Sequence, residues 1–224
     1  MIITIDGPAG SGKSTAARQL AKALGIAYLD TGAMYRALTL AALRRKLDLA
    51  NEAALEELAR GLDLRLEQTG GQLRVILAGQ DASREIRQAE VTENAHYAAR
   101  APGVRAVLVD KQRQIGLQLN RSAGGVVAEG RDQGSVVFPD ADFKFFLDAT
   151  PEVRARRRCE EMLADGQQAD FQQVLQALLT RDGRDRSRLA APLVVPEGAI
   201  QIDTSRMSIE EVTLRLKQVV ERGR

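Results

Sequence analysis

The chain has 224 residues, of which 44% are hydrophobic and 28% charged, and its 32 Lys and Arg residues nearly balance 30 Asp and Glu residues. The resulting net charge of +2 argues against a general nucleic-acid binder, which is usually clearly basic, and a chain of this length can bury a core without a disulfide or a structural metal. The presence of only one cysteine and one histidine excludes an intrachain disulfide and a zinc site built from Cys and His.

The first predicted element is a buried strand at residues 2–5, an apolar β-branched run that ends at Asp6 and Gly7. The N-terminal residues therefore lack the pattern of a signal peptide. No apolar run in the chain approaches the about 18 residues that a membrane span needs. We expect a cytoplasmic protein.

Three helices and a strand are predicted next. Helical periodicity over residues 13–24 stops at Gly25, and a short strand follows near 26–29. Two stretches rich in Ala and Leu, with charged residues on one face, predict helices at 33–46 and 52–60.

Residues 62–79 have a different pattern. Apolar and polar side chains alternate along LDLRLEQ, a Thr-Gly-Gly turn follows at 69–71, and the alternation resumes along QLRVILA. This pattern predicts a β-hairpin. Because a hairpin is antiparallel, we expect it to form an insert outside a parallel core.

The rest of the chain continues to alternate between helical and strand patterns, and Ser208 and Glu211 have the spacing of a capping box at the start of the last helix. This alternation predicts an α/β fold with a doubly wound, mostly parallel sheet covered by helices on both faces. The helices are predicted at 88–100, 103–118, 151–164, 170–188 and 208–223, and the strands at 124–130, 143–149 and 199–203.

A phosphate-binding loop joins the first strand to the first helix. Residues 7–14 match G-x-x-x-x-G-K-[ST] at every fixed position, and the strand before them and the helix after them are the context that this motif requires. We expect Lys13, as an exposed loop cation, to reach the β- and γ-phosphates of ATP, and the Ser14 hydroxyl to bind Mg²⁺. The nucleotide-binding residues predicted here are Gly7, Pro8, Ala9, Gly10, Ser11, Gly12, Lys13, Ser14 and Thr15.

The loop indicates nucleotide binding without naming the reaction. The chain has no Asn-Lys-x-Asp motif for reading guanine, which argues against a GTPase, and it is too short for most motor or transporter ATPases. A kinase of small molecules with mobile lids fits best. The acceptor stays open at this point between several monophosphates and shikimate, and an ATP-binding module without an acceptor is the alternative from another class.

Three further clusters of polar residues are candidates for the acceptor site. Thr31 and Arg36 follow the second strand, where they could hold a phosphate or serve only as a helix cap and a solvated arginine. The sequence Glu-Gly-Arg-Asp at 129–132 follows the strand GGVVA, and open α/β sheets bind ligands at the carboxyl ends of their strands. The third cluster, at 181–188, has arginines and aspartates at i, i+4 and i+7, which would share one helix face.

These motifs together resemble the bacterial cytidylate kinases of the P-loop nucleoside monophosphate kinase family over nearly the whole chain. The segments that carry the resemblance are IDGPAGSGKST, LDTGAMYRA, REIR, PGVR with LVDKQR, EGRDQGSVVFPDA, FKFFLDA, RDGRDRSR, APL and a final IDT. The resemblance implies a three-layer P-loop fold and transfer of the γ-phosphoryl group from ATP, with Mg²⁺, to CMP or dCMP.

The resemblance also implies roles for single residues. Thr31 and Arg36 lie near the acceptor phosphate, Arg105 and Asp132 meet the cytosine base, and Arg181 and Asp185 contact the sugar. Arg131 and Arg188 lie around the phosphates and are implied to be catalytic with Lys13, and Arg157 belongs to an arginine-rich lid over ATP. Glu129, where the family commonly has Asp, is implied to contact Mg²⁺ with Ser14, and His96 stands where the family often has a serine near the base.

The implied organisation is one nucleoside monophosphate kinase domain that acts as a monomer. The core covers about 1–60, 103–150 and 170–224, the acceptor-binding insert covers about 61–102, and the lid covers about 151–169. The implied partners are small-molecule substrates rather than nucleic acid or membrane.

Overall fold

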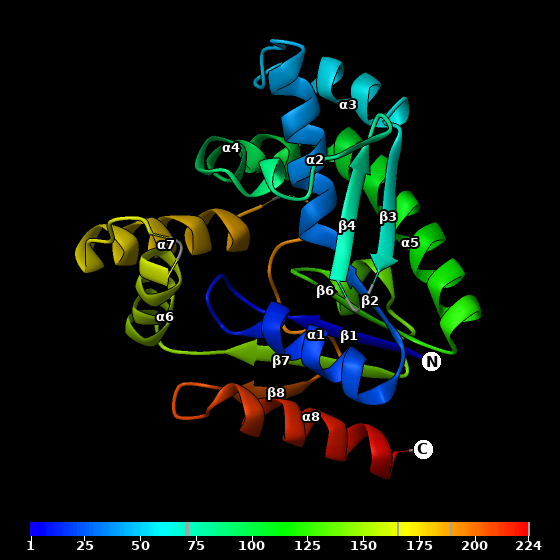
Figure 1. The fold of residues 1–224 in the computed structure, drawn as a ribbon, viewed down its shortest axis with the longest axis vertical. Helices are drawn as coiled ribbons and strands as arrows, with labels where there is room; N and C mark the ends of the chain where they lie inside the picture. Colours follow the sequence, from blue (N-terminus) through cyan, green and yellow to red (C-terminus); the bar gives the residue numbers. More distant parts are fainter. Residues whose placement is uncertain (70–71, 165, 189, 224) are drawn as a thin grey trace.

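A computed structural model describes residues 1–69, 72–164, 166–188 and 190–223, and Figure 1 shows its arrangement. Its centre is a five-stranded parallel sheet in the order β2-β6-β1-β7-β8. The strands are β1 (Ile2–Asp6), β2 (Ala27–Asp30), β6 (Val126–Gly130), β7 (Phe143–Asp148) and β8 (Ile200–Asp203). The predicted parallel α/β sheet is confirmed.

Both faces of this sheet are buried. Alternate side chains of each strand point to opposite faces, and helices cover both. Ile3 and Ile5 belong to the cluster formed with α1 (Lys13–Leu24) and α8 (Ile209–Arg222). Val126 and Ala128 belong to the opposite cluster, formed with α5 (Pro102–Ala123). The helices on both faces make the three layers that the alternation predicts.

A second unit lies beyond the edge of the parallel sheet that β2 forms (Figure 1). It contains an antiparallel sheet of β3 (Leu64–Thr69), β4 (Gln72–Leu77) and β5 (Gln80–Asp81), and the β3–β4 pairing confirms the predicted hairpin. The two glycines of the predicted turn, Gly70 and Gly71, lie outside the described residues. The surrounding helices are α2 (Thr31–Arg44), α3 (Glu52–Arg60), a short 3-10 turn at Glu85–Arg87 and α4 (Ala89–Arg100).

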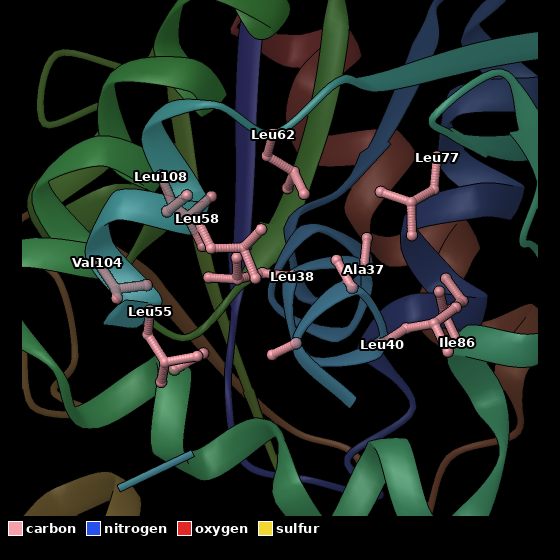
Figure 2. Close-up of a cluster of buried hydrophobic side chains, with 14 of the residues drawn as sticks. Ala37, Leu38, Leu40, Leu55, Leu58, Leu62, Leu77, Ile86, Val104 and Leu108 are labelled. Atoms are coloured by element: carbon pink, nitrogen blue, oxygen red, sulfur yellow. The ribbon is translucent and has the colours of Figure 1, made fainter. Parts of the chain in front are cut away.

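Leucine-rich packing holds this second unit together. Figure 2 shows Leu38 of α2 beside Leu58 of α3 and Leu108 of α5, and all three are buried. Because α2 follows directly from β2 and the same α5 covers the parallel sheet, the second unit is fixed to the core by continuous helices.

The helices α6 (Pro151–Ala164) and α7 (Phe171–Arg186) form a third group with their own small cluster of apolar side chains, which also contains Ala9 of the phosphate loop. Figure 1 shows this pair beyond the arrowhead of β7, on the opposite side from the two chain ends. The pair therefore lies at the carboxyl ends of the parallel strands, where open α/β sheets bind their ligands.

Several element boundaries differ from the prediction. The helix expected at 103–118 continues to Ala123, and Gly124 ends it in the left-handed conformation with a φ of 70°, so β6 starts at Val126 rather than at 124. A five-residue π-helix at Gln133–Val137 was not expected. The capping box of α8 is confirmed, because Ser208 and Glu211 exchange both hydrogen bonds.

No helix among the described residues is long and apolar enough to cross a membrane.

Candidate active site

The loop between β1 and α1 has the backbone geometry of a phosphate cradle. Gly7, Gly10 and Gly12 have φ values of 149°, 76° and 84°, which side-chain-bearing residues rarely adopt. A Cβ at Gly7 would also collide with the backbone carbonyl of Leu147 in β7. The chain can therefore turn tightly around an anion at the N-terminus of α1, where backbone N–H groups and the helix dipole favour negative charge.

Lys13 is the first residue of α1 and is buried, with only 6% of its surface exposed, so the expectation of an exposed loop cation was wrong. Its Nζ donates to the carbonyl of Pro8 at 3.1 Å, which folds the side chain back over the loop. Burial lowers the pKa of Lys13 to about 7, and the nearby charge of Arg131 adds to that effect while the Glu129 carboxylate opposes it. An anion in the loop would add a further negative charge beside Lys13.

Ser14 and Glu129 lie together, although 115 positions separate them in the sequence. The Ser14 hydroxyl acts to lower the pKa of the Glu129 carboxylate, which accepts a 3.2 Å hydrogen bond from the hydroxyl of Tyr28. Burial and the neighbouring carboxylate of Asp30 raise the pKa of Glu129, whereas Lys13 acts against that rise. Oxygen ligands beside excess negative charge fit a hard divalent cation such as Mg²⁺.

Protein groups alone would not complete the shell of such a cation. Within the described part of the chain, no three His, Cys, Asp or Glu side chains gather as a metal site. Mg²⁺ commonly binds through one or two protein oxygens and takes its other ligands from substrate phosphates and water. The Ser14 and Glu129 pair fits that kind of site.

The end of β2 positions Arg36. Asp30 caps α2 by accepting the N–H of Ala33 at 2.9 Å, and its second oxygen accepts Nη2 of Arg36 at 2.9 Å. Burial alone would raise the pKa of Asp30, but Arg36 and the Ala33 N–H outweigh it and hold that pKa below its usual value. The alternative that Thr31 caps the helix is wrong, because Thr31 is inside the helix and donates instead to the carbonyl of Glu129 at 2.7 Å.

Three predicted residues from two distant segments form one ion cluster. The Asp185 carboxylate accepts Nε of Arg131 at 2.9 Å and Nη2 of Arg188 at 2.6 Å. The spacing argument was partly wrong, because α7 ends at Arg186 and Arg188 reaches Asp185 from beyond the helix. Arg181 lies at the exposed rim of this cluster, where its charge still acts on Lys13 and Arg131.

Two arginine groups of the site have unsatisfied donors. The Nε atoms of Arg36 and Arg188 are buried and have no hydrogen-bond partner among the described residues. A buried polar group without a partner costs about 1–3 kcal/mol, more if it is charged. Guanidinium donors left in this state point to an anionic ligand that completes them.

Asp132 and Arg105 form a buried ion pair between α5 and the segment after β6, and each is about 95% buried. The second oxygen of Asp132 lies 3.4 Å from the side-chain Nε2 of Gln133, which also donates to the side-chain oxygen of Gln112 at 3.3 Å. The guanidinium of Arg105 lies 5.9 Å from the ring centre of Tyr35. A carboxylate and a planar guanidinium thus face each other beside an aromatic ring, an arrangement that suits a flat, hydrogen-bonding ligand.

Arg157 does not join the other predicted catalytic residues. It donates to the hydroxyl of Thr204 at 3.0 Å, to the carbonyl of the same residue at 2.6 Å and to the carbonyl of Met207 at 3.3 Å. The residue nevertheless lies beside Gly12 of the phosphate loop. It therefore borders the loop without contacting Arg131 or Arg188.

Arg154 is the buried arginine that ties α6 to the rest of the site. It donates to the carbonyl of Ala9 in the phosphate loop at 3.0 Å and to the carbonyl of Ala149 after β7 at 2.9 Å. Its Nη2 lies 2.7 Å from the Asp182 carboxylate of α7. The side chains of this ion pair are only 2% and 3% exposed. The pair fixes the α6–α7 group to the loop.

Replacing Asp182 by Ala should strongly destabilise the protein. The change leaves the Arg154 guanidinium buried without its carboxylate, a loss of about 3–5 kcal/mol. Chemical denaturation of the variant would measure the free energy of unfolding. Asp203→Ala, which removes an exposed carboxylate that accepts hydrogen bonds from Ser205 in its own turn, is the control. A loss below about 1 kcal/mol for Asp182→Ala would contradict the buried pair.

His96 is half-buried on α4, where its ring lies 4.2 Å from that of Tyr97 and its Nδ1 is 2.7 Å from the carbonyl of Glu93. These contacts are local to the helix.

The prediction from sequence missed several buried polar residues that support the site. Asp6, Arg154 and Asp182 are each at most 2% exposed, and Gln112 and Gln133 are fully buried. Asp6 could have been found, because a carboxylate at the end of a buried strand is costly unless it is hydrogen-bonded. Burial raises the pKa of Asp6 to about 7, even though the N–H groups of Gly134 and Gln133 act to lower it.

The family model and the most similar sequences agree on one family. The family model described as cytidylate kinase matches residues 3–222. A cytidylate kinase of Caldanaerobacter subterraneus subsp. tengcongensis is 47% identical over 99% of this chain and 95% of the relative. A cytidylate kinase of Salmonella paratyphi B is 48% identical over 94% of this chain and 91% of the relative.

A solved structure of an uncharacterized protein from Eubacterium ventriosum superposes with a TM-score of 0.50 at 12% identity, covering 99% of this chain and 98% of that one. This similarity supports the fold alone.

Proposed function

The chain belongs to the cytidylate kinase family, and from that premise we propose that it transfers the γ-phosphoryl group of ATP to CMP or dCMP, giving ADP with CDP or dCDP. The observation that carries this proposal is the meeting of two anion sites at the carboxyl ends of the parallel strands. The phosphate loop with Lys13 forms one of them, and the cluster of Arg131, Asp185 and Arg188 forms the other.

The protein does little covalent chemistry in such a transfer, since positioning and charge stabilisation provide most of the catalysis. The acceptor is itself a phosphate that is ionised near pH 7, so no strong general base is needed. Lys13, Arg131 and Arg188 would neutralise charge that develops on the transferred group. The unpartnered Nε atoms of Arg36 and Arg188 support contacts to the acceptor phosphate, which Thr31 would border.

We assign recognition of the cytosine base to Asp132 and Arg105. Cytosine offers an amino donor, which a carboxylate accepts, and N3 and O2 acceptors, which a guanidinium matches in its plane. In uracil, O4 would face the carboxylate and N3–H would face the guanidinium, so both protein groups would be poorly paired. The buried Asp132 and Arg105 pair supports this assignment, because it holds a carboxylate acceptor and a guanidinium donor side by side.

Mg²⁺ would be held by Ser14 and Glu129, and when bound it would neutralise phosphate charge on ATP. Burial and the Asp30 carboxylate favour a proton on Glu129. A bound cation would take the place of that proton, so the buried setting of Glu129 is compatible with metal binding. Gly7, Gly10 and Gly12 would wrap the same phosphates.

Ser14→Ala should weaken the dependence of ATP binding on Mg²⁺. We expect the gain in ATP affinity that Mg²⁺ provides to fall by about tenfold, because one of two protein oxygens at the ion is lost. Calorimetric titrations with ATP, with and without Mg²⁺, would measure the ratio of the two ATP affinities for the variant and for the wild-type protein. An unchanged gain would remove Ser14 from the metal site.

Asp185→Ala should impair the acceptor side. The change frees Arg131 and Arg188 from their shared carboxylate and removes an acceptor for the sugar hydroxyls, and we expect kcat/KM for CMP to fall by about 10- to 150-fold. Asp170→Ala is a matched control, because Asp170 caps the same helix at its far end by accepting the N–H of Gln173. Unchanged acceptor kinetics in Asp185→Ala would return this cluster to a purely structural role.

We further propose a single kinase domain that acts as a monomer in the cytoplasm, in pyrimidine nucleotide metabolism. Residues 61–102 would form the acceptor-binding insert and 151–169 the lid. One apolar cluster joins Leu77 of the insert to Leu38 and Leu108 of the core, which supports the proposal of a single domain. Arg157 would belong to the lid edge that faces ATP, since it borders Gly12.

A panel of acceptors tests the proposed function. ATP, Mg²⁺ and one monophosphate at a time are mixed with the purified protein, and ADP release is followed. CMP and dCMP should stimulate release strongly, UMP less and AMP and GMP hardly at all. A preference for AMP or UMP would overturn the proposal, and so would the absence of any stimulation.

A further inference from the structure

Asp6 ends β1 and immediately precedes the phosphate loop, and none of its surface is exposed. One carboxylate oxygen accepts the N–H of Gln133 and the other accepts the N–H of Gly134, each at 2.8 Å. A buried carboxylate is costly, and both of its oxygens are used here on two consecutive backbone groups of a distant segment.

The segment that Asp6 holds begins directly after Arg131 and Asp132. The carbonyl of Asp132 accepts the N–H groups of Val136 and Val137 at 2.9 and 3.1 Å, so the following π-helix and the carboxylate of Asp6 fix the backbone of this residue from two sides. The direction of the Asp132 side chain therefore depends on the anchoring of the next two backbone N–H groups, those of Gln133 and Gly134, by Asp6.

The surroundings leave this segment little room to shift. A Cβ at Gly134 would lie 2.9 Å from the hydroxyl of Thr4 and 3.0 Å from the ring of Pro196. A Cβ at Gly130 would lie 2.7 Å from the hydroxyl of Thr31. Gly134 thus allows the backbone to approach Thr4 of β1 closely enough for both hydrogen bonds to Asp6, and Gly130 leaves room for the side chains of Thr31 and Gln133.

We propose that Asp6 is a positioning residue for acceptor recognition, which fixes Asp132 and Arg131 relative to the phosphate loop. Asp6 is covalently joined to that loop and hydrogen-bonded to the acceptor segment, so it links the ATP side of the site to the CMP side. This inference rests on the proposed function, because it assigns the cytosine base to Asp132.

Asp6→Ala and Asp6→Asn test this role. The Asn variant keeps the shape, but its amide group must turn its own N–H toward one of the two backbone donors, so it should share the defect. We expect the Kd for CMP to rise by about tenfold or more and the ratio of kcat/KM for CMP over UMP to narrow by about tenfold. The Kd for ATP with Mg²⁺ should change by less than about threefold.

Two further variants separate positioning from general loss of stability. Leu216→Ala removes a fully buried side chain of α8 on the other face of the sheet, and it should lower the free energy of unfolding while it leaves CMP affinity and the CMP-over-UMP ratio unchanged. Gly134→Ala keeps Asp6 but pushes the segment away from Thr4, and it should reproduce the acceptor defect.

The possible outcomes are distinct. If the Asp6 variants are less stable but keep the CMP affinity and the ratio, Asp6 is structural and the inference is overturned. If ATP binding weakens as much as CMP binding, Asp6 serves the phosphate loop instead. If Asp6→Ala does not fold, Asp6→Asn and Gly134→Ala decide. A wild-type protein that does not phosphorylate CMP would refute the proposed function rather than the role of Asp6.

Discussion

Lys13→Ala should reduce turnover of ATP and CMP by roughly 100- to 1,000-fold or more, because it removes the cation that we assign to the reacting phosphates. The side chain is buried over the phosphate loop, and burial and repulsion from Arg131 lower its pKa to about 7 even though the Glu129 carboxylate acts against that shift. Anions in the loop would relieve this repulsion. Turnover of the variant, measured under saturating ATP and CMP, gives the effect.

The matched control for this prediction is Lys22→Ala, which removes an exposed lysine from the last turn of the same helix. It should leave turnover near the wild-type value. Lys13→Arg should not restore activity fully, since the planar guanidinium differs in shape from the compact ammonium. Near-normal turnover of Lys13→Ala would contradict the assignment of the loop to ATP.

Asp132→Ala should lower activity with CMP and narrow the preference for CMP over UMP by roughly 10- to 100-fold. A well-placed pair of hydrogen bonds discriminates between bases by about 1–3 kcal/mol, and a polar site discriminates because the wrong base leaves buried groups unpaired. Asp132 is 4% exposed and pairs with Arg105, so its loss leaves that guanidinium without a carboxylate. The ratio of kcat/KM for CMP to that for UMP measures the effect.

Asp110→Ala is the control for base recognition, because Asp110 is an exposed carboxylate on the helix that carries Arg105. Its CMP-over-UMP ratio should equal that of the wild-type protein. If Asp132→Ala loses activity equally with both pyrimidines, Asp132 supports the site without reading the base.

Local patterns in the sequence predict much of the fold. Alternating helices and strands predict the parallel sheet, the alternation at 62–79 predicts the β3–β4 hairpin, and Ser208 with Glu211 predicts the start of α8. Each of these signals depends on neighbours within a few residues. The phosphate loop is predicted for the same reason, because its motif and its strand–helix context are contiguous.

The pairings between distant segments could not be predicted in this way. Arg131 meets Asp185 across 54 positions, and Asp6 meets Gly134 across 128 positions. Helical spacing placed Arg188 on the face of Asp185, but the helix ends before Arg188 and the contact forms from the following segment. Such partners depend on how the sheet brings strand ends together, which no local pattern contains.

Buried charges were the hardest feature to predict. The arginines at 154–158 look alike in the sequence, yet Arg154 is almost fully buried against Asp182 while Arg157 bonds to Thr204. Their roles differ because each side of α6 meets a different neighbour.

The most direct test of the proposed reaction follows the phosphoryl group itself. ATP labelled in its γ-phosphate is incubated with the wild-type protein, Mg²⁺ and CMP, and the labelled products are separated. We expect the label to appear in CDP, with one CDP formed for each ADP. Label that accumulates in inorganic phosphate, or that stays in ATP while CMP is present, would contradict it.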